Sequence, residues 1–169
     1  MNNSEAIFTL SEALVSELIA AGKSVATAES CTGGWIAKSL TDIAGSSQCF
    51  AYGIVSYSNG AKESLLGVAP ASLAEHGAVS EPVVQEMARG VLGLSGADIA
   101  VAVSGIAGPD GGSDEKPVGT VWLGFAERGN HYADSETAKF VLKGDREEIR
   151  AQTVILALQG LRERLRASG

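Results

Sequence analysis

The sequence predicts an α/β fold in which helices cover both faces of a mixed β-sheet. Helical and strand-like patterns alternate through the first two thirds of the chain. Residues 99–103 form an apolar run without alternation, which is typical of a strand buried on both faces. A hairpin pattern follows over residues 119–142. With 169 residues, 45% of them hydrophobic, we expect a single-domain three-layer α/β/α sandwich over residues 1–169.

The first half of the chain is predicted to open with a long helix and then to alternate between strands and short helices. Leu10, Leu14 and Leu18 repeat at helical spacing, and Gly22 is placed to end their helix. Aromatic and β-branched residues mark the second strand. The predicted elements are a helix over 4–21, a strand over 24–28, a helix from 35 to 45, a strand over 49–57, and short helices over 59–66 and 71–75.

Two capping patterns organise the second half. Ser80 precedes Glu81-Pro82 and is a candidate N-cap, and Asp145 with Glu148 three residues later resembles a capping box. The predicted elements are a helix after residue 80, strands over 99–103, 119–126 and 132–142 with a turn at 128–130, and a last helix after 145. The glycine-rich loop over 105–117 is long for a compact domain, so we expect it to contribute to a functional site.

Composition narrows the function classes. The chain carries 20 acidic and 13 basic residues, a net charge of −7, which disfavours nucleic acid and anionic membranes as partners. Cys31 and Cys49 form neither a disulfide framework nor a zinc pattern, and the aspartates have no metal-ligand spacing. The N-terminus lacks a signal-peptide pattern, and no stretch is long enough to span a membrane. We therefore expect a cytoplasmic protein without a bound metal.

A possible nucleophile lies between the first predicted strand and the following helix. Ser30 is followed by Thr32, Gly33 and Gly34. The first N–H groups of a helix have no intrahelical partner, so they can bind a phosphate or a developing oxyanion. Ser30 is thus a candidate nucleophile beside free backbone donors. The alternative, in which Ser30 only caps the helix and the glycines allow tight packing, stays open at this stage.

A serine nucleophile needs a base. His76 follows a helix-ending pattern and His131 follows the hairpin turn, so both fit capping or surface positions better than a catalytic triad, and no G-x-S-x-G elbow occurs. The alternative base is a lysine whose pKa is lowered by burial or by a neighbouring cation, and Lys62 is the best candidate. Tyr57 could relay a proton, and Asn59 could hold a substrate amide or order the loop.

The chain resembles the CinA C-terminal domain family over roughly residues 5–165. The resemblance rests on several blocks in order: residues 28–34, Gly45-Ser46-Ser47, Tyr57-Ser58-Asn59 with Lys62, Gly77-Ala78-Val79-Ser80, and residues 104–112 through Pro117-Val118-Gly119-Thr120. It implies hydrolysis of the carboxamide of nicotinamide mononucleotide to nicotinic acid mononucleotide and ammonia, without a cofactor. By resemblance, Ser30 would form an acyl-enzyme, Lys62 would be the general base, and Tyr57 would relay or orient a proton.

The implied substrate is a small molecule that carries a phosphate. Arg146, at the start of the last helix, is the candidate phosphate ligand, although a surface role fits it almost as well. Ser104 and Gly105 end the buried strand where ligands gather in α/β sheets, and N–H groups around residues 32–34 could stabilise the oxyanion. We expect a homo-oligomer. A non-catalytic nucleotide-sensing or partner-binding module is the alternative function, because it would need only the glycine-rich loops.

Overall fold

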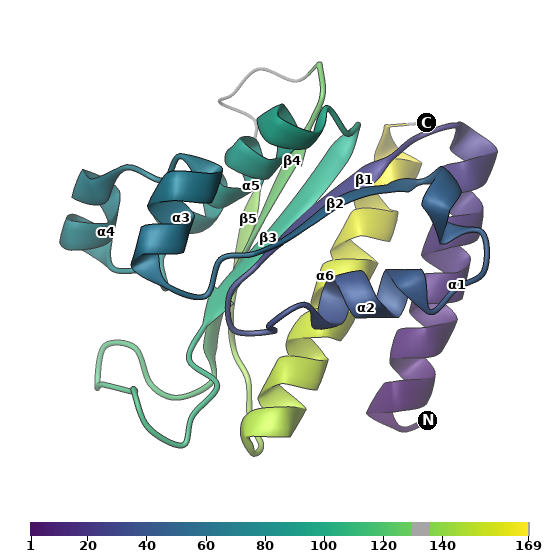
Figure 1. The fold of residues 1–169 in the computed structure, drawn as a ribbon. Coiled ribbons are helices and arrows are strands. Elements are labelled where there is room, and N and C mark those ends of the chain that lie inside the picture. The colour runs from purple at the N-terminus through teal and green to yellow at the C-terminus, as the bar shows by residue number, and fades with distance from the viewer. Residues whose placement is uncertain (130–135, 169) are drawn as a thin grey trace.

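A five-stranded sheet lies between two helical layers in this computed structural model, which describes residues 1–129 and 136–168 (Figure 1). The strands are β1 (Val25–Glu29), β2 (Phe50–Val55), β3 (Ile99–Gly105), β4 (Thr120–Glu127) and β5 (Thr137–Val141). The helices are α1 (Asn3–Ala21), α2 (Trp35–Thr41), α3 (Asn59–Leu66), α4 (Pro70–His76), α5 (Glu81–Ser95) and α6 (Arg146–Ala167), with a 3₁₀ turn, η1, at Ser46–Gln48. The predicted α/β/α sandwich is confirmed.

The sheet is mixed, as predicted. Its strand order is β2-β1-β3-β4-β5. β1 pairs in parallel with both β2 and β3, whereas β3 with β4 and β4 with β5 are antiparallel. Helices α1, α2 and α6 cover one face, and α3, α4 and α5 lie on the other (Figure 1). The first three strands therefore end at the same edge.

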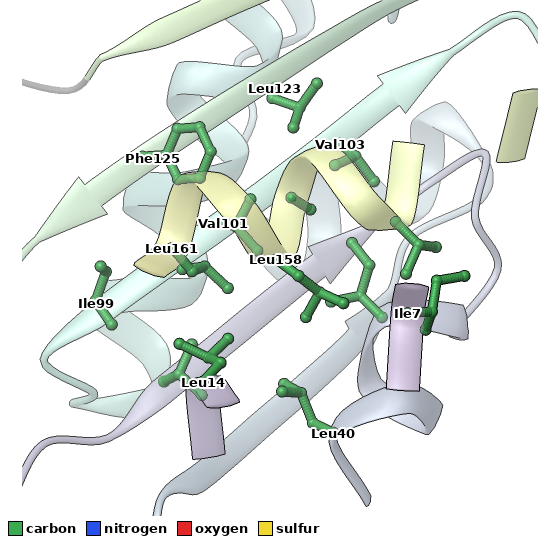
Figure 2. Packing of buried hydrophobic residues seen from close by; sticks show 14 of the residues in the cluster. Ile7, Leu14, Leu40, Ile99, Val101, Val103, Leu123, Phe125, Leu158 and Leu161 are labelled. Carbon is green, nitrogen blue, oxygen red and sulfur yellow. The ribbon is translucent and has the colours of Figure 1, made fainter. Parts of the chain in front are cut away.

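The two faces of the sheet carry side chains of different size. Val101 and Val103 of β3 point into the cluster with α1 and α6, whereas Ala100 and Ala102 point toward α5. Figure 2 shows how the larger side chains fill the first layer, among them Leu14, Val101, Val103, Leu158 and Leu161. On the other face, a Cβ at Gly124 would lie 2.8 Å from the carbonyl carbon of Val84. Small residues there let α5 lie close to the sheet.

Helix ends follow the local signals at both ends of the chain. Gly22 ends α1 in the left-handed conformation (φ 64°), and Asp145 with Glu148 forms a complete capping box at α6. Ser80 is the N-cap of α5, although its hydroxyl donates to the carbonyl of Gly77 at 2.7 Å. The helix predicted to reach Gly45 ends at Thr41 instead. None of the described helices has the length and apolar character to cross a bilayer.

Two strand predictions need adjustment. β2 ends at Val55, two residues before the predicted end, and leaves Ser56 and Tyr57 in the turn to α3. β5 covers only the second part of the strand predicted over 132–142. The predicted turn residue Asn130 and His131 lie outside the described residues. The shorter β2 matters for function, because the turn it frees carries contacts to Lys62.

Candidate active site

The carboxyl ends of the parallel strands bring the predicted site residues to one edge of the sheet. Ser30 follows β1, Tyr57 follows β2, and Ser104 lies near the end of β3. The amide of Ser30 donates to the carbonyl of Val103 in β3 at 3.0 Å, which ties the start of the turn to the central strand. Ligands of open α/β sheets bind at this edge. The topology therefore gathers segments that are far apart in the sequence (Figure 1).

Ser30 and Lys62 form a hydrogen-bonded pair. The Nζ of Lys62 lies 2.8 Å from the Oγ of Ser30. Helix α3 places the lysine, because the hydroxyl of Ser58 accepts a hydrogen bond from the amide of Ala61 and caps the helix one turn before Lys62. Lys62 is only 1% exposed, whereas a lysine in the first turn of a short helix is usually solvated.

Two main-chain carbonyls hold the Lys62 amine against Ser30. Nζ donates to the oxygen of Ser56 at 2.8 Å and to that of Tyr57 at 3.4 Å. Burial lowers the pKa of Lys62, because the ammonium loses its hydration. A neutral amine has two N–H donors for the carbonyls and one lone pair, which then faces the Ser30 hydroxyl. This is the arrangement that a serine nucleophile with a lysine general base requires.

A cavity of about 290 Å³ opens over the pair. Seven of the ten predicted site residues line it, namely Ser30, Tyr57, Asn59, Lys62, Ser104, Gly105 and Arg146. Thr32, Gly33 and Gly34 are described by the structure but are not part of this lining. The structure thus brings together the predicted nucleophile, base, proton relay and phosphate ligand, and leaves the double-glycine turn outside the cavity.

Arg146 connects three segments at the mouth of the cavity. Its two terminal nitrogens donate to the carbonyl of Gly108 at 2.7 Å and to the hydroxyl of Tyr57 at 3.1 Å. Arg146 is the first residue of α6, so the end of the last helix is linked to the glycine-rich loop and to the turn after β2. The loop also contributes Asp110 to the lining. A cation and a carboxylate therefore face the same cavity.

The double-glycine turn does not line the cavity, where it was expected to bind an oxyanion, and instead shapes the backbone after Ser30. Gly33 (φ 60°) and Gly34 (φ 100°) are left-handed, and Gly34 is the N-cap of α2, so the alternative in which Ser30 only caps this helix is wrong. The amide of Gly33 donates to the carbonyl of Ser30 at 3.1 Å. The turn therefore folds back on Ser30.

Two amides in the first turn of α2 are directed at a buried carboxylate. Those of Ile36 and Ala37 donate to Glu29 at 2.8 and 3.1 Å. The hydroxyl of Thr32 donates to the same carboxylate at 2.6 Å. Free donors were expected at this helix start, whereas these donors bind the side chain of the residue before Ser30.

Two residues of this region were missed by the sequence analysis. Glu29 stands next to Ser30 in the sequence and Arg150 stands one helical turn after Arg146, and these positions were the available signals. Arg150 donates from Nε to the carbonyl of Cys31 and from a terminal nitrogen to that of Thr32, both at 3.0 Å. Its guanidinium also lies over the ring of Trp35, 5.4 Å from the centroid. Helix α6 thus holds the outer side of the turn.

Other potential nucleophiles and ligands are poorly placed. Burial raises the pKa of Cys31 to about 12, so this cavity-lining cysteine stays a thiol. The side chain of His76 is 43% exposed, lies 3.7 Å from Glu75 and is not part of the described cavity lining. Within the described part of the chain, no three His, Cys, Asp or Glu side chains are grouped as metal ligands would be.

Comparison with known proteins finds relatives along nearly the whole chain. A model of the CinA C-terminal domain matches residues 7–165. The nicotinamide-nucleotide amidohydrolase PncC of Escherichia coli (strain K12) is 56% identical over 162 residues, which cover 95% of each chain. The PncC of Enterobacter agglomerans is 58% identical over 91% of this chain and 93% of its own. A CinA-like protein of Chlorobaculum tepidum is 53% identical, and the match spans 38% of that longer protein.

Solved structures agree with these matches. A CinA superfamily protein from Klebsiella pneumoniae 700603 superposes with a TM-score of 0.90 at 42% identity and covers 99% of both chains. A competence/damage inducible protein from Agrobacterium tumefaciens also reaches 0.90, at 44% identity over 94% of both chains. The family model, the relatives and the solved structures all cover nearly the whole chain, including the segments that carry Ser30 and Lys62. The protein therefore belongs to the CinA C-terminal domain family.

Proposed function

We propose that this protein is an amidase that hydrolyses nicotinamide mononucleotide to nicotinic acid mononucleotide and ammonia, a step of pyridine-nucleotide salvage. Relatives that match in length and exceed half identity carry the name nicotinamide-nucleotide amidohydrolase. The observation that carries the proposal is the 2.8 Å contact between Lys62 Nζ and Ser30 Oγ under a cavity. A protein that only binds a nucleotide would need the cavity alone. Hydrolysis also needs a nucleophile with a base in contact, which the buried Lys62 beside Ser30 provides.

In the acylation half of the reaction, Ser30 attacks and Lys62 moves the proton. The neutral amine of Lys62 takes the hydroxyl proton as Oγ bonds to the carboxamide carbon. The same proton is then delivered to the amide nitrogen, the C–N bond breaks, and ammonia leaves. The product of this half-reaction is an ester between the nicotinoyl group and Ser30.

Water completes the cycle by the reverse proton path. Lys62, neutral again, takes a proton from the attacking water, and the second tetrahedral intermediate collapses with departure of Ser30 Oγ. Lys62 returns the proton to Ser30, which restores the starting state. Tyr57 lines the cavity beside this pair, and its hydroxyl is oriented by Arg146 at 3.1 Å, so we assign it the role of orienting or relaying the proton.

The rest of the cavity is assigned to the nucleotide. Arg146 is the phosphate ligand in this proposal, because its guanidinium lies at the cavity of a protein with a net charge of −7 and offers paired donors. Asn59, Ser104 and Gly105 supply further contacts from α3 and the end of β3. At Gly105 a Cβ would lie 3.2 Å from the sulfur of Cys31, so a larger residue would crowd the wall beside Ser30.

We further propose that residues 1–169 act as one domain, in a homo-oligomer located in the cytoplasm. The two cysteines, both free and buried, fit a reducing compartment. Small enzymes commonly form symmetric oligomers. Light scattering tests the oligomeric state, and cell fractionation tests the location.

The activity itself is tested by ammonia release and nicotinic acid mononucleotide formation from nicotinamide mononucleotide with a chelator present. The wild type is compared with Ser30→Ala, Lys62→Ala and the control Lys38→Ala, whose lysine is exposed and pairs with Asp42. We expect turnover that falls by at least about 10³-fold in the first two variants and is kept in the control. No turnover by the folded wild type, or full turnover by Ser30→Ala, would contradict the proposal and favour a binding module or another nucleophile.

A further inference from the structure

Glu29 is a fully buried carboxylate next to the proposed nucleophile. It is the last residue of β1 and is 0% exposed. Its Oε1 accepts hydrogen bonds from the Thr32 hydroxyl at 2.6 Å and the Ile36 amide at 2.8 Å, and its Oε2 accepts one from the Ala37 amide at 3.1 Å. A carboxylate without donors would be very costly at this depth. These three donors, two of them at a helix N-terminus, make the buried position tolerable.

The same residue is connected to the proposed base through its main chain. The carbonyl of Glu29 accepts a hydrogen bond from the amide of Ser56 at 2.8 Å. The carbonyl of Ser56 in turn accepts one from Lys62 Nζ, also at 2.8 Å. The same Lys62 Nζ lies 2.8 Å from Ser30 Oγ, so this chain of hydrogen bonds returns to the residue after Glu29. Glu29 therefore contacts both the segment that carries the nucleophile and the segment that holds the base.

Glu29 is placed to fix the turn rather than to meet a substrate. Its carboxylate faces Thr32 and the start of α2, and neither Glu29 nor Thr32 belongs to the described lining of the cavity. The left-handed residues Gly33 and Gly34 give this turn more backbone freedom than other residues would. The carboxylate bonds to both sides of that flexible point and so removes the freedom.

We propose that Glu29 is a positioning residue, whose carboxylate locks the turn over residues 30–34 in the conformation that keeps Ser30 Oγ against Lys62 Nζ. The inference concerns activation of Ser30 and rests on the proposed function only for the identity of the substrate. Glu29 acts through Ser30 and touches no reacting atom. Loss of its carboxylate therefore lowers the reactivity of Ser30 and kcat, while KM changes little.

The test uses Glu29→Gln, Glu29→Ala and Thr32→Val. Glutamine keeps one oxygen for Thr32 and Ile36 but sets a second donor against the Ala37 amide, so it rescues part of what alanine loses. Thr153→Val is the matched control, because Thr153 is also 0% exposed and its hydroxyl makes one buried hydrogen bond, at 2.7 Å to Ile149 within α6. Thr32→Val keeps the test valid if Glu29→Ala does not fold.

Two readouts separate positioning from stability and from substrate identity. The first is the rate at which a fluorophosphonate probe labels Ser30, followed by mass spectrometry, and the second is kcat and KM on nicotinamide mononucleotide, with thermal unfolding recorded alongside. We expect labelling and kcat to fall about 10- to 100-fold in Glu29→Ala and less in Glu29→Gln and Thr32→Val. We expect KM to stay within about twofold, and Thr153→Val to lose thermal stability while keeping both rates.

Several outcomes would overturn the inference. Wild-type labelling rates in Glu29→Gln and Thr32→Val would do so, as would an equal loss of labelling in Thr153→Val or a wild type that the probe does not label. If the wild type is labelled and the variants follow the expected order, but nicotinamide mononucleotide is not hydrolysed, the proposed function fails while the positioning role of Glu29 stands.

Discussion

Gly90→Ala is expected to displace Lys62 from Ser30 and so to lower both stability and activity. Gly90 lies in α5 against Leu66, the last residue of α3. An added Cβ would lie 2.8 Å from the carbonyl carbon of Leu66 and 3.1 Å from its Cα, and closer still to the carbonyl oxygen. Ordinary van der Waals contact begins at 3.4 Å, so the two helices must separate by at least about 0.6 Å.

That displacement reaches the proposed catalytic pair because Lys62 and Leu66 are one turn apart in the same eight-residue helix. Misplacing a catalytic group by 1 Å can cost about 10²-fold in rate, so a shift of this size is expected to lower kcat on the order of 10-fold. Overpacking adds a loss of about 1–3 kcal/mol in the free energy of unfolding. Urea unfolding and kcat on nicotinamide mononucleotide measure the two effects.

Gly93→Ala is the control from the same helix. A Cβ at Gly93 meets no atom within 4 Å. The better helix propensity of alanine is expected to raise stability by about 0.5–1 kcal/mol, with kcat unchanged. A Gly90→Ala variant with wild-type kcat and wild-type unfolding free energy would refute the reasoning, since α3 would then have room that the structure denies it.

The remaining predictions concern charge. The rate constant kcat/KM should rise with pH through the pKa of Lys62, which burial holds below its usual 10.5, because the neutral amine is the proposed base. A rate that falls over that range would contradict this role. Arg146→Met should raise KM at least about 10-fold for nicotinamide mononucleotide but change it little for the unphosphorylated nucleoside, and equal losses on both substrates would exclude phosphate binding. Arg162 lowers the pKa of Glu17, so this pair stabilises the fold above the usual glutamate pKa of 4.5, and its contribution is lost as pH falls through the lowered value. Glu17→Gln should therefore cost about 1 kcal/mol at neutral pH and nothing in strong acid, whereas a pH-independent difference in urea unfolding would show another cause.

The sequence predicted best what local chemistry decides. The ends of α1 and α6 follow from Gly22 and from the Asp145–Glu148 box, because a cap depends on residues three or four positions apart. The end of β2 was placed too late, because Tyr57 continues an aromatic and β-branched pattern. Tertiary contacts end the strand there, since Lys62 takes up the carbonyl of Ser56.

The site needed long-range information that no local pattern contains. Ser30 and Lys62 were identified as candidates, but their contact depends on parallel pairing of β1 and β2 and on the burial of α3. Glu29 was missed because a carboxylate at a strand end is usually solvated. Only the placement of the α2 amides around it reveals that its carboxyl group is bound inside the protein.

The hydrogen bond from Ser30 to Val103 has a consequence for synthesis of the chain. All three proposed catalytic residues lie before residue 63 in the sequence. Ser30 is nevertheless hydrogen-bonded to β3, and α3 packs against α5, and both of these partners come later in the chain. A nascent polypeptide that has emerged only as far as Leu66 carries Ser30, Tyr57 and Lys62 without the strand and helix that hold them together. Hydrolysis by a ribosome-bound chain would therefore begin only after β3 has emerged and docked. The onset of activity would then report when these elements fold during synthesis of the chain.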